Sequence, residues 1–340
     1  MKNGLKVSSF FIILLALVVF PLSAQRGRGP IIINLASLVP ENTPWGTELK
    51  KMSAEWARIT NGEVLLQVFH GGIRGDEAEV LRKLRVNEIQ AAMFTSSGLN
   101  TLVDETMTLS YPLLIRNNKE LDVVMEKIRP ELNAKFQQTG FVTLALARAG
   151  WVRLFSKEPI ITPADARKYR MGTTPDDEKM LQAFKTLGFK MFPISNNDLM
   201  VSLRSQGGIE AFYYSPIAAA GSQLFGVAKN MSSLNLAPLM GGIIINNAAW
   251  NRIPAQYRPQ LQAAFRRLET QIESSIVTLE TDAINVMEKY GLKINRLTEA
   301  QEQAWYDDLA RYEKDLVGPV FKQDLYRRIT TILAEYRKGQ

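Results

Sequence analysis

The chain has no cysteine and a single histidine, His70, among its 340 residues. The absence of cysteine excludes disulfides, thiolate nucleophiles and cysteine-ligated metals. One histidine is too few for a histidine-rich zinc site, and a Ser-His-Asp enzyme would depend on that residue alone. His70 lies where a predicted strand ends in Gly71-Gly72, a position at which a structural histidine is the more common case. We therefore expect no catalytic residues, no metal and no cofactor.

The chain also lacks a concentrated block of basic residues. Its net charge is +7, but the lysines and arginines are spread along the sequence without interleaved aromatic residues. Nucleic-acid binding is therefore not expected. Hydrophobic residues make up 46% of the chain and charged residues 22%, which is typical of a globular protein large enough for one big domain or two lobes.

The N-terminus has the three parts of a secretory signal. Lys2 and Lys6 precede the apolar run Phe10 to Phe20, which leads into Pro21-Leu22-Ser23-Ala24. The run is shorter than the about 20 residues that span a membrane. We expect residues 1–24 to be a signal peptide cleaved after Ala24, which makes the protein periplasmic, with an uncleaved membrane anchor as the alternative.

Strand, loop and helix patterns alternate through the next 220 residues or so. The predicted strands are Ile31 to Leu35, Val64 to Phe69, Ala91 to Phe94, Trp151 to Phe155, Ile209 to Tyr214 and Gly241 to Asn246. This alternation favours an α/β fold with mixed, mostly parallel sheets, built as two α/β units.

The last third of the chain is predicted to be helical. From Pro259 to Val286, apolar residues recur at steps of three and four, which predicts a helix through about Tyr290, stopped by Gly291. At 1.5 Å per residue the helix would be roughly 45–50 Å long, enough to brace both units. A coiled coil with a partner helix is the rival interpretation of the same stripe.

One arginine stands out in this pattern. Arg170 lies in a short predicted strand, Tyr169 to Met171, where a guanidinium could clamp a carboxylate through two parallel hydrogen bonds. The local pattern alone favours the alternative, a solvated arginine at a sheet edge.

Residues that suit a ligand cleft gather near the predicted strand ends, where open α/β sheets bind their ligands. Ser96 offers a small hydroxyl that could line a cleft or cap a helix. The aromatic residues at these ends are Trp45, Phe94, Tyr111, Trp151, Phe212, Tyr213 and Tyr214. We predict that they line a cleft, although any one of them could instead belong to the core.

Several segments, in order, resemble one known family. They read L-A-S-L-V-P-E-N-T-P-W-G, E-V-L-L-Q-V-F-H-G-G, L-R-K-L-R-V-N-E-I-Q-A-A-M-F-T-S-S-G-L, L-S-Y-P-L-L, K-Y-R-M, A-F-K-T-L-G-F-K-M-F-P-I and I-I-I-N-N-A-A-W-N-R-I-P. They cover roughly residues 31–258 and resemble the DctP-like solute receptors of tripartite ATP-independent periplasmic (TRAP) transporters. The resemblance implies a two-lobed periplasmic-binding-protein-like fold with a long lobe-spanning helix. The first lobe would comprise residues 31–149 plus about 236–272, and the second 150–235 plus about 273–340.

The resemblance places the family's carboxylate-binding arginine on Arg170. Other positions depart from the family: Val152 follows Gly150-Trp151 where a second ligand-contacting arginine is common, and Arg153, one residue later, should face the other way. Tyr213-Tyr214 replaces the usual Glu-Asn, and Glu210-Ala211 replaces the usual Asp-Gly. These changes remove charge and add aromatic area.

We therefore expect a receptor that closes around a hydrophobic or amphipathic monocarboxylate and delivers it to the subunits of a TRAP membrane permease. Arg170 would bind the polar end of the ligand; alternatively it makes only a structural ion pair. The resemblance also allows a tetratricopeptide-repeat partner protein. The competing interpretations are an exported interaction or sensory protein on the same fold and, less favoured, an exported hydrolase that uses His70 and a serine.

Overall fold

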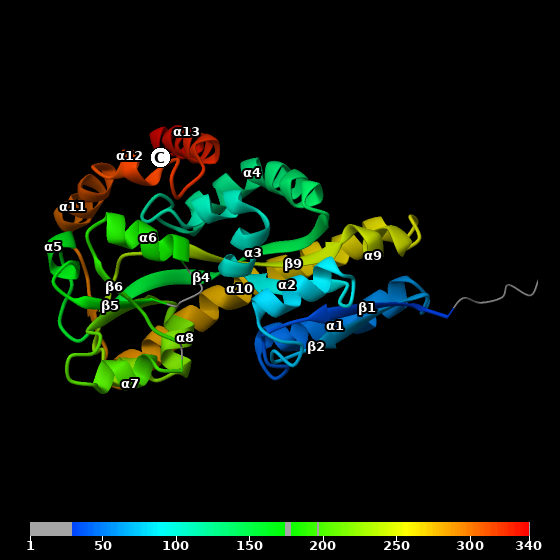
Figure 1. Cartoon of the computed structure of the whole chain (residues 1–340), viewed down its shortest axis with the longest axis horizontal. Helices are drawn as coiled ribbons and strands as arrows, with labels where there is room; N and C mark the ends of the chain where they lie inside the picture. The colour runs from blue at the N-terminus through cyan, green and yellow to red at the C-terminus, as the bar shows by residue number, and fades with distance from the viewer. Residues whose placement is uncertain (1–28, 174–177, 196, 340) are drawn as a thin grey trace, which may run out of the picture.

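The computed structural model describes residues 29–173, 178–195 and 197–339, so the predicted signal peptide lies outside it. The described chain forms two α/β lobes side by side, joined by segments that run through both (Figure 1). Eight strands follow one another in the order β2-β1-β3-β9-β4-β7-β5-β6, with β8 and β10 attached beside β4. The predicted two-lobed fold is confirmed.

The first lobe is built on parallel strands with helices between them. The strand β1 (Ile31–Ala36) lies between β2 (Val64–Phe69) and β3 (Ala91–Thr95) and is parallel to both. The connecting helices are α1 (Pro44–Ile59) and α2 (Glu77–Arg85). Each helix starts at a capping side chain: Thr43 accepts from the amide of Gly46, and Asp76 accepts from the amide of Glu79. The predicted strands of this lobe are confirmed.

The second lobe repeats the parallel arrangement. In it, β5 (Arg170–Thr173) lies between β6 (Lys190–Pro193) and β7 (Ala211–Tyr214). The helix α6 (Glu178–Thr186) buries Met180 and Phe184, the apolar face that its helical spacing predicts.

Two long strands join the lobes. The strand β4 (Phe141–Ser156) pairs with β9 (Ala237–Asn246) as far as Val152, and with β7 from Arg153 onward. Its pairing shifts register between Arg148 and Gly150, and Gly150 has a φ of +119°, which side chains rarely adopt. The sequence predicts a strand only from Trp151, because the register shift interrupts the alternation before it.

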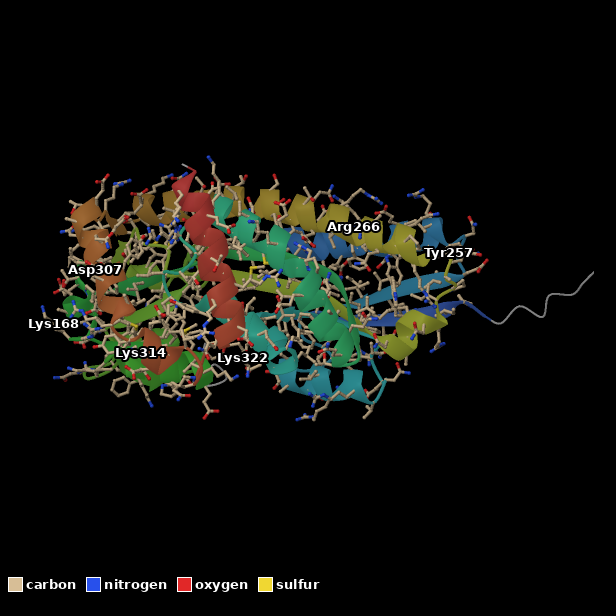
Figure 2. The ribbon with its side chains drawn as sticks, turned by 90° about the horizontal axis from the view of Figure 1, so that it is seen from above. Lys168, Tyr257, Arg266, Asp307, Lys314 and Lys322 are labelled. Carbon is tan, nitrogen blue, oxygen red and sulfur yellow. The ribbon has the colours of Figure 1, made fainter. Side chains whose placement is uncertain are left out.

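The predicted long helix is α10 (Arg258–Lys289), with Gly291 just after its end. Its 32 residues correspond to about 48 Å. It contacts α1 of the first lobe, β4 of the crossing, and α8 (Pro216–Gly221) of the second lobe. Trp56 of α1 packs edge-on against Phe265 of α10 at 5.7 Å between ring centroids, so the stripe is used within the chain. In Figure 2, Tyr257 beside the start of α10 and Lys168 of the second lobe lie at opposite ends of the molecule.

The C-terminal helices cover one face of both lobes. The helix α11 (Glu299–Ala310) contacts α5 (Pro163–Ala166), and α12 (Glu313–Leu316) contacts α6. The last helix, α13 (Gln323–Lys338), packs on α4 (Asn118–Gln138) of the first lobe, as Figure 2 shows. The predicted lobe boundaries, which place all of 273–340 in the second lobe, remain a prediction. The remaining elements are α3 (Ser96–Leu102), η1 (Asp104–Ser110), α7 (Leu199–Arg204), η2 (Leu224–Gly226), β8 (Asn230–Ser232), α9 (Asn247–Arg252) and β10 (Lys293–Asn295).

Across the described residues, no helix combines the length and the apolar character needed to cross a membrane.

Candidate functional site

A cavity of about 960 Å³ lies between the two lobes. The first lobe contributes α2, α3 and the segment around η1, and the second lobe contributes α6, β7 and the start of α8. The cavity is within the range of about 300–1,000 Å³ that is usual for small-molecule sites. Because the cavity lies between the two lobes, closure of the lobes would enclose a ligand there.

The residues that follow the ends of β3 and β7 form part of the cavity wall. The strand β3 ends at Thr95, whose hydroxyl accepts a hydrogen bond from the amide of Ser97 at 3.3 Å and so begins α3. The strand β7 ends at Tyr214, and Ser215 caps α8 by accepting from the amide of Ala218 at 3.2 Å. Both caps place polar backbone turns at the carboxyl edge of parallel strands, where α/β folds bind ligands.

Three of the predicted ligand contacts line this cavity: Ser96, Tyr213 and Tyr214. The Ser96 hydroxyl is tied to the backbone of Met240, donating to its carbonyl at 3.1 Å and accepting from its amide at 3.0 Å. Tyr213 packs on Phe184 at 4.8 Å between ring centroids, and its hydroxyl lies 2.5 Å from the Thr173 hydroxyl.

Other polar groups of the first-lobe wall are also used within the protein. Asn100 accepts from the Thr106 hydroxyl at 2.7 Å, and the Thr101 hydroxyl donates to the carbonyl of Ser97 at 3.1 Å. The second-lobe wall is apolar over Met180, Phe184 and Val152. The wall therefore combines polar side chains that are satisfied within the protein with an apolar stretch from the second lobe.

Arg170 does not line the cavity. Its Nε donates to the carbonyl of Gly208 at 2.7 Å, its backbone amide donates to Glu210 at 3.1 Å, and its guanidinium lies 3.5 Å from the same carboxylate. Arg170 begins β5, so it lies at the amino end of the strand, whereas the cavity lies at the carboxyl end. This geometry favours the structural ion pair among the two predicted roles; ligand binding by Arg170 stays an untested prediction.

The remaining predicted aromatics lie in the cores of the lobes, away from the cavity wall. Trp151, Phe94 and Phe212 are buried, and Trp45 is half-buried against the first-lobe core. Phe212 stacks on Phe155 with a centroid distance of 5.3 Å. The Nε1 of Trp151 donates to Asn118 at 2.7 Å. Phe212 is buried in the second-lobe core, whereas the next two residues of β7, Tyr213 and Tyr214, line the cavity. A place near a strand end therefore does not by itself put an aromatic side chain in the cavity wall.

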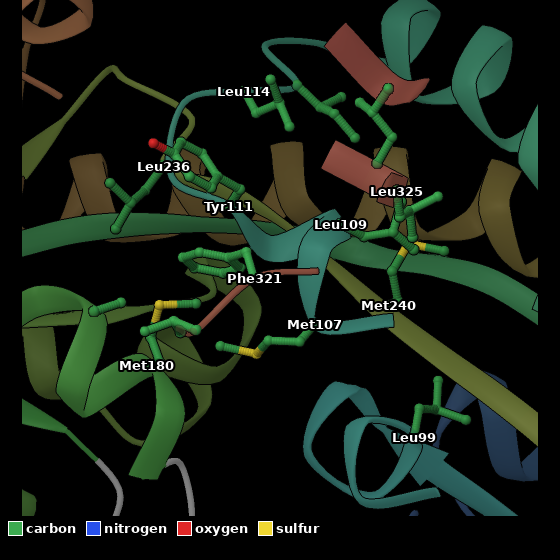
Figure 3. Close-up of a cluster of buried hydrophobic side chains, with 14 of the residues drawn as sticks. Leu99, Met107, Leu109, Tyr111, Leu114, Met180, Leu236, Met240, Phe321 and Leu325 are labelled. Carbon is green, nitrogen blue, oxygen red and sulfur yellow. The ribbon is translucent and has the colours of Figure 1, made fainter. Parts of the chain in front are cut away.

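Tyr111 is also a core residue. Its ring packs on Phe321 at 4.8 Å and on Tyr326 at 4.9 Å between centroids. Figure 3 shows Tyr111 and Phe321 in the buried cluster, above Met107 and Met180, which come from different lobes. Burial raises the pKa of Tyr111 to about 12.

Val152 stands where the family often has an arginine, and its side chain lies in the cavity wall. Val152 lines the cavity, whereas Arg153 points to the opposite face of β4, where it interacts electrostatically with Glu280 of α10. Burial lowers the pKa of the Arg153 guanidinium and raises the pKa of the Glu280 carboxyl.

The sequence interpretation missed the charged residues of the wall, which all come from α2: Asp76, Glu77, Arg82 and Arg85. Their positions on a helix that follows a parallel strand could have indicated that these residues face the cleft. Among the described residues, no group of three or more histidine, cysteine, aspartate or glutamate side chains could hold a metal ion.

The fold and the cavity define the class: a two-lobed solute-binding protein. The chain belongs to the family of bacterial extracellular solute-binding proteins, family 7, whose model matches residues 35–317. The predicted resemblance is thereby confirmed.

Among known relatives, the chain is 22% identical to the C4-dicarboxylate-binding periplasmic protein DctP of Rhodobacter capsulatus, over 85% of this chain and 87% of that protein. Solved structures of TRAP periplasmic solute-binding proteins share the fold. One, from Sulfurospirillum deleyianum with bound succinate, has a TM-score of 0.76 and 21% identity over 89% of this chain and 99% of that one. Another, from Ralstonia eutropha with bound (S)-2-acetolactate, has a TM-score of 0.77 and 18% identity over the same shares.

Proposed function

We propose that the protein is a periplasmic receptor that binds a small organic acid between its lobes and delivers it to a TRAP-type membrane permease. The supporting observation is the cavity of about 960 Å³ between the lobes of a chain that belongs to this receptor family. The structural neighbours from Sulfurospirillum deleyianum and Ralstonia eutropha hold succinate and (S)-2-acetolactate, both small carboxylates. A tetratricopeptide-repeat partner stays a prediction that nothing in the fold bears on.

Within this class we propose a monocarboxylate with an apolar body. The second-lobe wall carries Val152, Met180 and Phe184, and the polar side chains Ser96 and Asn100 are occupied by internal hydrogen bonds. Each methylene of a ligand buried against such a wall contributes about 0.8 kcal/mol. A second carboxylate placed against the same wall would lose its hydration without a partner.

Isothermal titration calorimetry of the mature chain with octanoate, succinate and D-glucuronate tests both levels of the proposal. We expect octanoate to bind one per chain and at least about tenfold more tightly than the other two acids. Succinate binding at least as tightly as octanoate would leave the receptor and contradict the apolar ligand. Failure of all three acids to bind would contradict an organic-acid receptor.

The variant Val152→Arg sharpens this test, because it places a cation where Val152 meets the cavity. We expect octanoate to bind more weakly and succinate more tightly than in the wild type. Arg58→Gln, on the exposed surface of α1, serves as a control that should change neither affinity. An unchanged preference in Val152→Arg would argue that the ligand does not contact this wall.

A further inference from the structure

We propose that Arg82 and Arg85 of α2 bind the ligand's carboxylate, so that the acid is held by the first lobe and its apolar body lies against the second. The inference rests on the proposed function. It adds the orientation of the ligand and the residues that bind its charged group.

The two arginines are the cationic side chains among the described residues that line the cavity. They lie three positions apart on α2, so they share one helix face with about 5–6 Å between their Cβ atoms. Two guanidinium groups at this spacing can donate to the two oxygens of one carboxylate, and charged hydrogen bonds of this kind are the strongest in proteins.

Neither arginine has a carboxylate partner among the described residues. The ion pair found on α2 joins Lys83 to Glu79 at 2.8 Å, and Lys83 also donates to the carbonyl of Arg74 at 2.8 Å. Arg82 and Arg85 are exposed at the cavity, so their donors are available to a ligand. The two arginines would bind a carboxylate more strongly when the lobes close, because removal of water strengthens the interaction between opposite charges.

The acidic residues of the same wall accept hydrogen bonds from groups other than the two arginines. Asp76 accepts from the amide of Glu79 at 2.7 Å, and Glu77 accepts from the amide and the hydroxyl of Thr95 at 2.5 and 3.0 Å. Both lie at the start of α2, and Arg85 is its last residue, nine positions after Asp76. At 1.5 Å per residue, Asp76 and Arg85 are about 13 Å apart along the helix axis, and Arg82 lies about 7–9 Å beyond the two acidic residues.

In its described part of the wall, the second lobe offers no competing cation. The side chains there are apolar or aromatic over Met180, Phe184 and Val152, and Arg170 is bonded to Gly208 and Glu210 outside the cavity. A ligand with one carboxylate therefore satisfies its charge on α2 and its apolar surface on the second lobe. This orientation is opposite to the one that the family resemblance implies for Arg170.

Basic residues in the last turn of a helix also stabilise it through the helix dipole, and a solvated helix end would show the same residues. Ligand affinity separates the two roles. A residue that only stabilises α2 would change the unfolding midpoint of the protein without changing its preference for an ionised ligand.

The test compares octanoate with octanamide, its uncharged counterpart, by calorimetry on the full mature chain. The wild type, Arg82→Gln/Arg85→Gln, Arg170→Gln and the surface control Arg58→Gln are measured side by side. We expect the double variant to bind octanoate at least about tenfold more weakly and octanamide within about twofold of the wild type. Arg170→Gln and Arg58→Gln should bind both probes as the wild type does.

The octanamide affinity reports that the cavity of each variant is intact, and circular dichroism reports its folding. Octanoate binding within twofold of the wild type in the double variant would overturn the inference and leave the receptor. A tenfold loss in Arg170→Gln alone would overturn it in favour of the second-lobe arginine. If the wild type binds neither probe, the proposed ligand class itself fails, and the inference fails with it.

Discussion

The residue that follows Gly150-Trp151 decides the character of the cavity wall. Val152 faces the cavity, while Arg153 faces α10, because neighbouring residues of a strand point to opposite sides. A shift of one position therefore places the arginine beside Glu280 and leaves an apolar side chain at the cavity. The alternation of side chains along a strand predicts this difference from the sequence.

Other site residues could not be predicted from local patterns. Arg170 looks suited to a carboxylate, yet its partners, Gly208 and Glu210, come from a loop about 40 positions away along the chain. The aromatics near strand ends likewise divide between core and cavity, and the packing of the whole lobe decides the division. Tyr213 and Tyr214 line the cavity, whereas Phe212 is buried.

A half-buried carboxylate at the crossing gives a pH-dependent prediction. Glu273 of α10 accepts from the backbone amide of Arg148 at 3.2 Å. Burial raises the pKa of Glu273 above its ordinary value of 4.5, and the nearby charges of Glu269 and Asp122 raise it further. The hydrogen bond from Arg148 and the charge of Arg148 oppose this rise without cancelling it. The folded state therefore holds the proton more tightly than the unfolded state, and stability is lost as pH rises above 4.5 through the folded pKa.

We expect Glu273→Gln, which keeps the acceptor and removes the charge, to raise the thermal unfolding midpoint at pH 7.5. The gain should shrink toward zero when the measurement is repeated below pH 4.5, where the carboxyl is protonated in both states. Glu288→Gln, at an exposed position of the same helix, is the control. A gain that is equal at both pH values would show that charge burial is not its cause.

At the scale of elements, most helices and strands are predicted from the spacing of apolar residues and from capping residues. The stripe from Pro259 predicts α10 to within a residue or two at both ends. The first three strands are predicted because short apolar runs alternate with helices. The continuous strand β4 is missed at its first half, where a register shift and Gly150 break the pattern of alternation.

One ion pair ties α11 to the second lobe. Arg167 donates from Nη1 to Asp308 at 3.1 Å, from Nη2 to the other oxygen of the same carboxylate, and from Nε to the carbonyl of Leu187 at 2.8 Å. Asp308 is only 7% exposed. Removing one partner of such a pair leaves the other charge partly buried and unpaired.

We expect Asp308→Ala to lower the free energy of unfolding by about 3 kcal/mol in urea denaturation. Asp307→Ala is the matched control, because Asp307 is exposed and bonded only to Gln303 among the described residues, at 2.7 Å. A loss below about 1 kcal/mol in Asp308→Ala would mean that packing, not the ion pair, fixes α11.

At the scale of the whole molecule, Asp104 connects the two lobes. It begins η1 in the first lobe and forms ion pairs with Lys179 of α6 in the second lobe and with Lys322, which precedes α13, at 2.9 Å. Burial and the nearby charge of Lys322 lower the pKa of Lys179. Without the carboxylate, the two lysines would repel each other across the lobe boundary.

We expect Asp104→Asn to favour a more open arrangement, with a larger radius of gyration in small-angle X-ray scattering of the unliganded protein. Octanoate affinity should fall, because part of the binding free energy would then be used for closure. Asp307→Asn, on the exposed surface of α11, should change neither quantity. An unchanged radius together with unchanged affinity would contradict a role of Asp104 in holding the lobes together.

The cavity itself could not be predicted from the sequence, since it depends on how two lobes that share β4, β9 and α10 face each other. A crystal structure of the mature protein with octanoate tests the central claim most directly. The account predicts one molecule in the cavity between the lobes, with its carboxylate within hydrogen-bond distance of Arg82 or Arg85 and its chain against Met180 and Phe184. An empty cavity at saturating octanoate, or the acid bound outside it, would contradict the account.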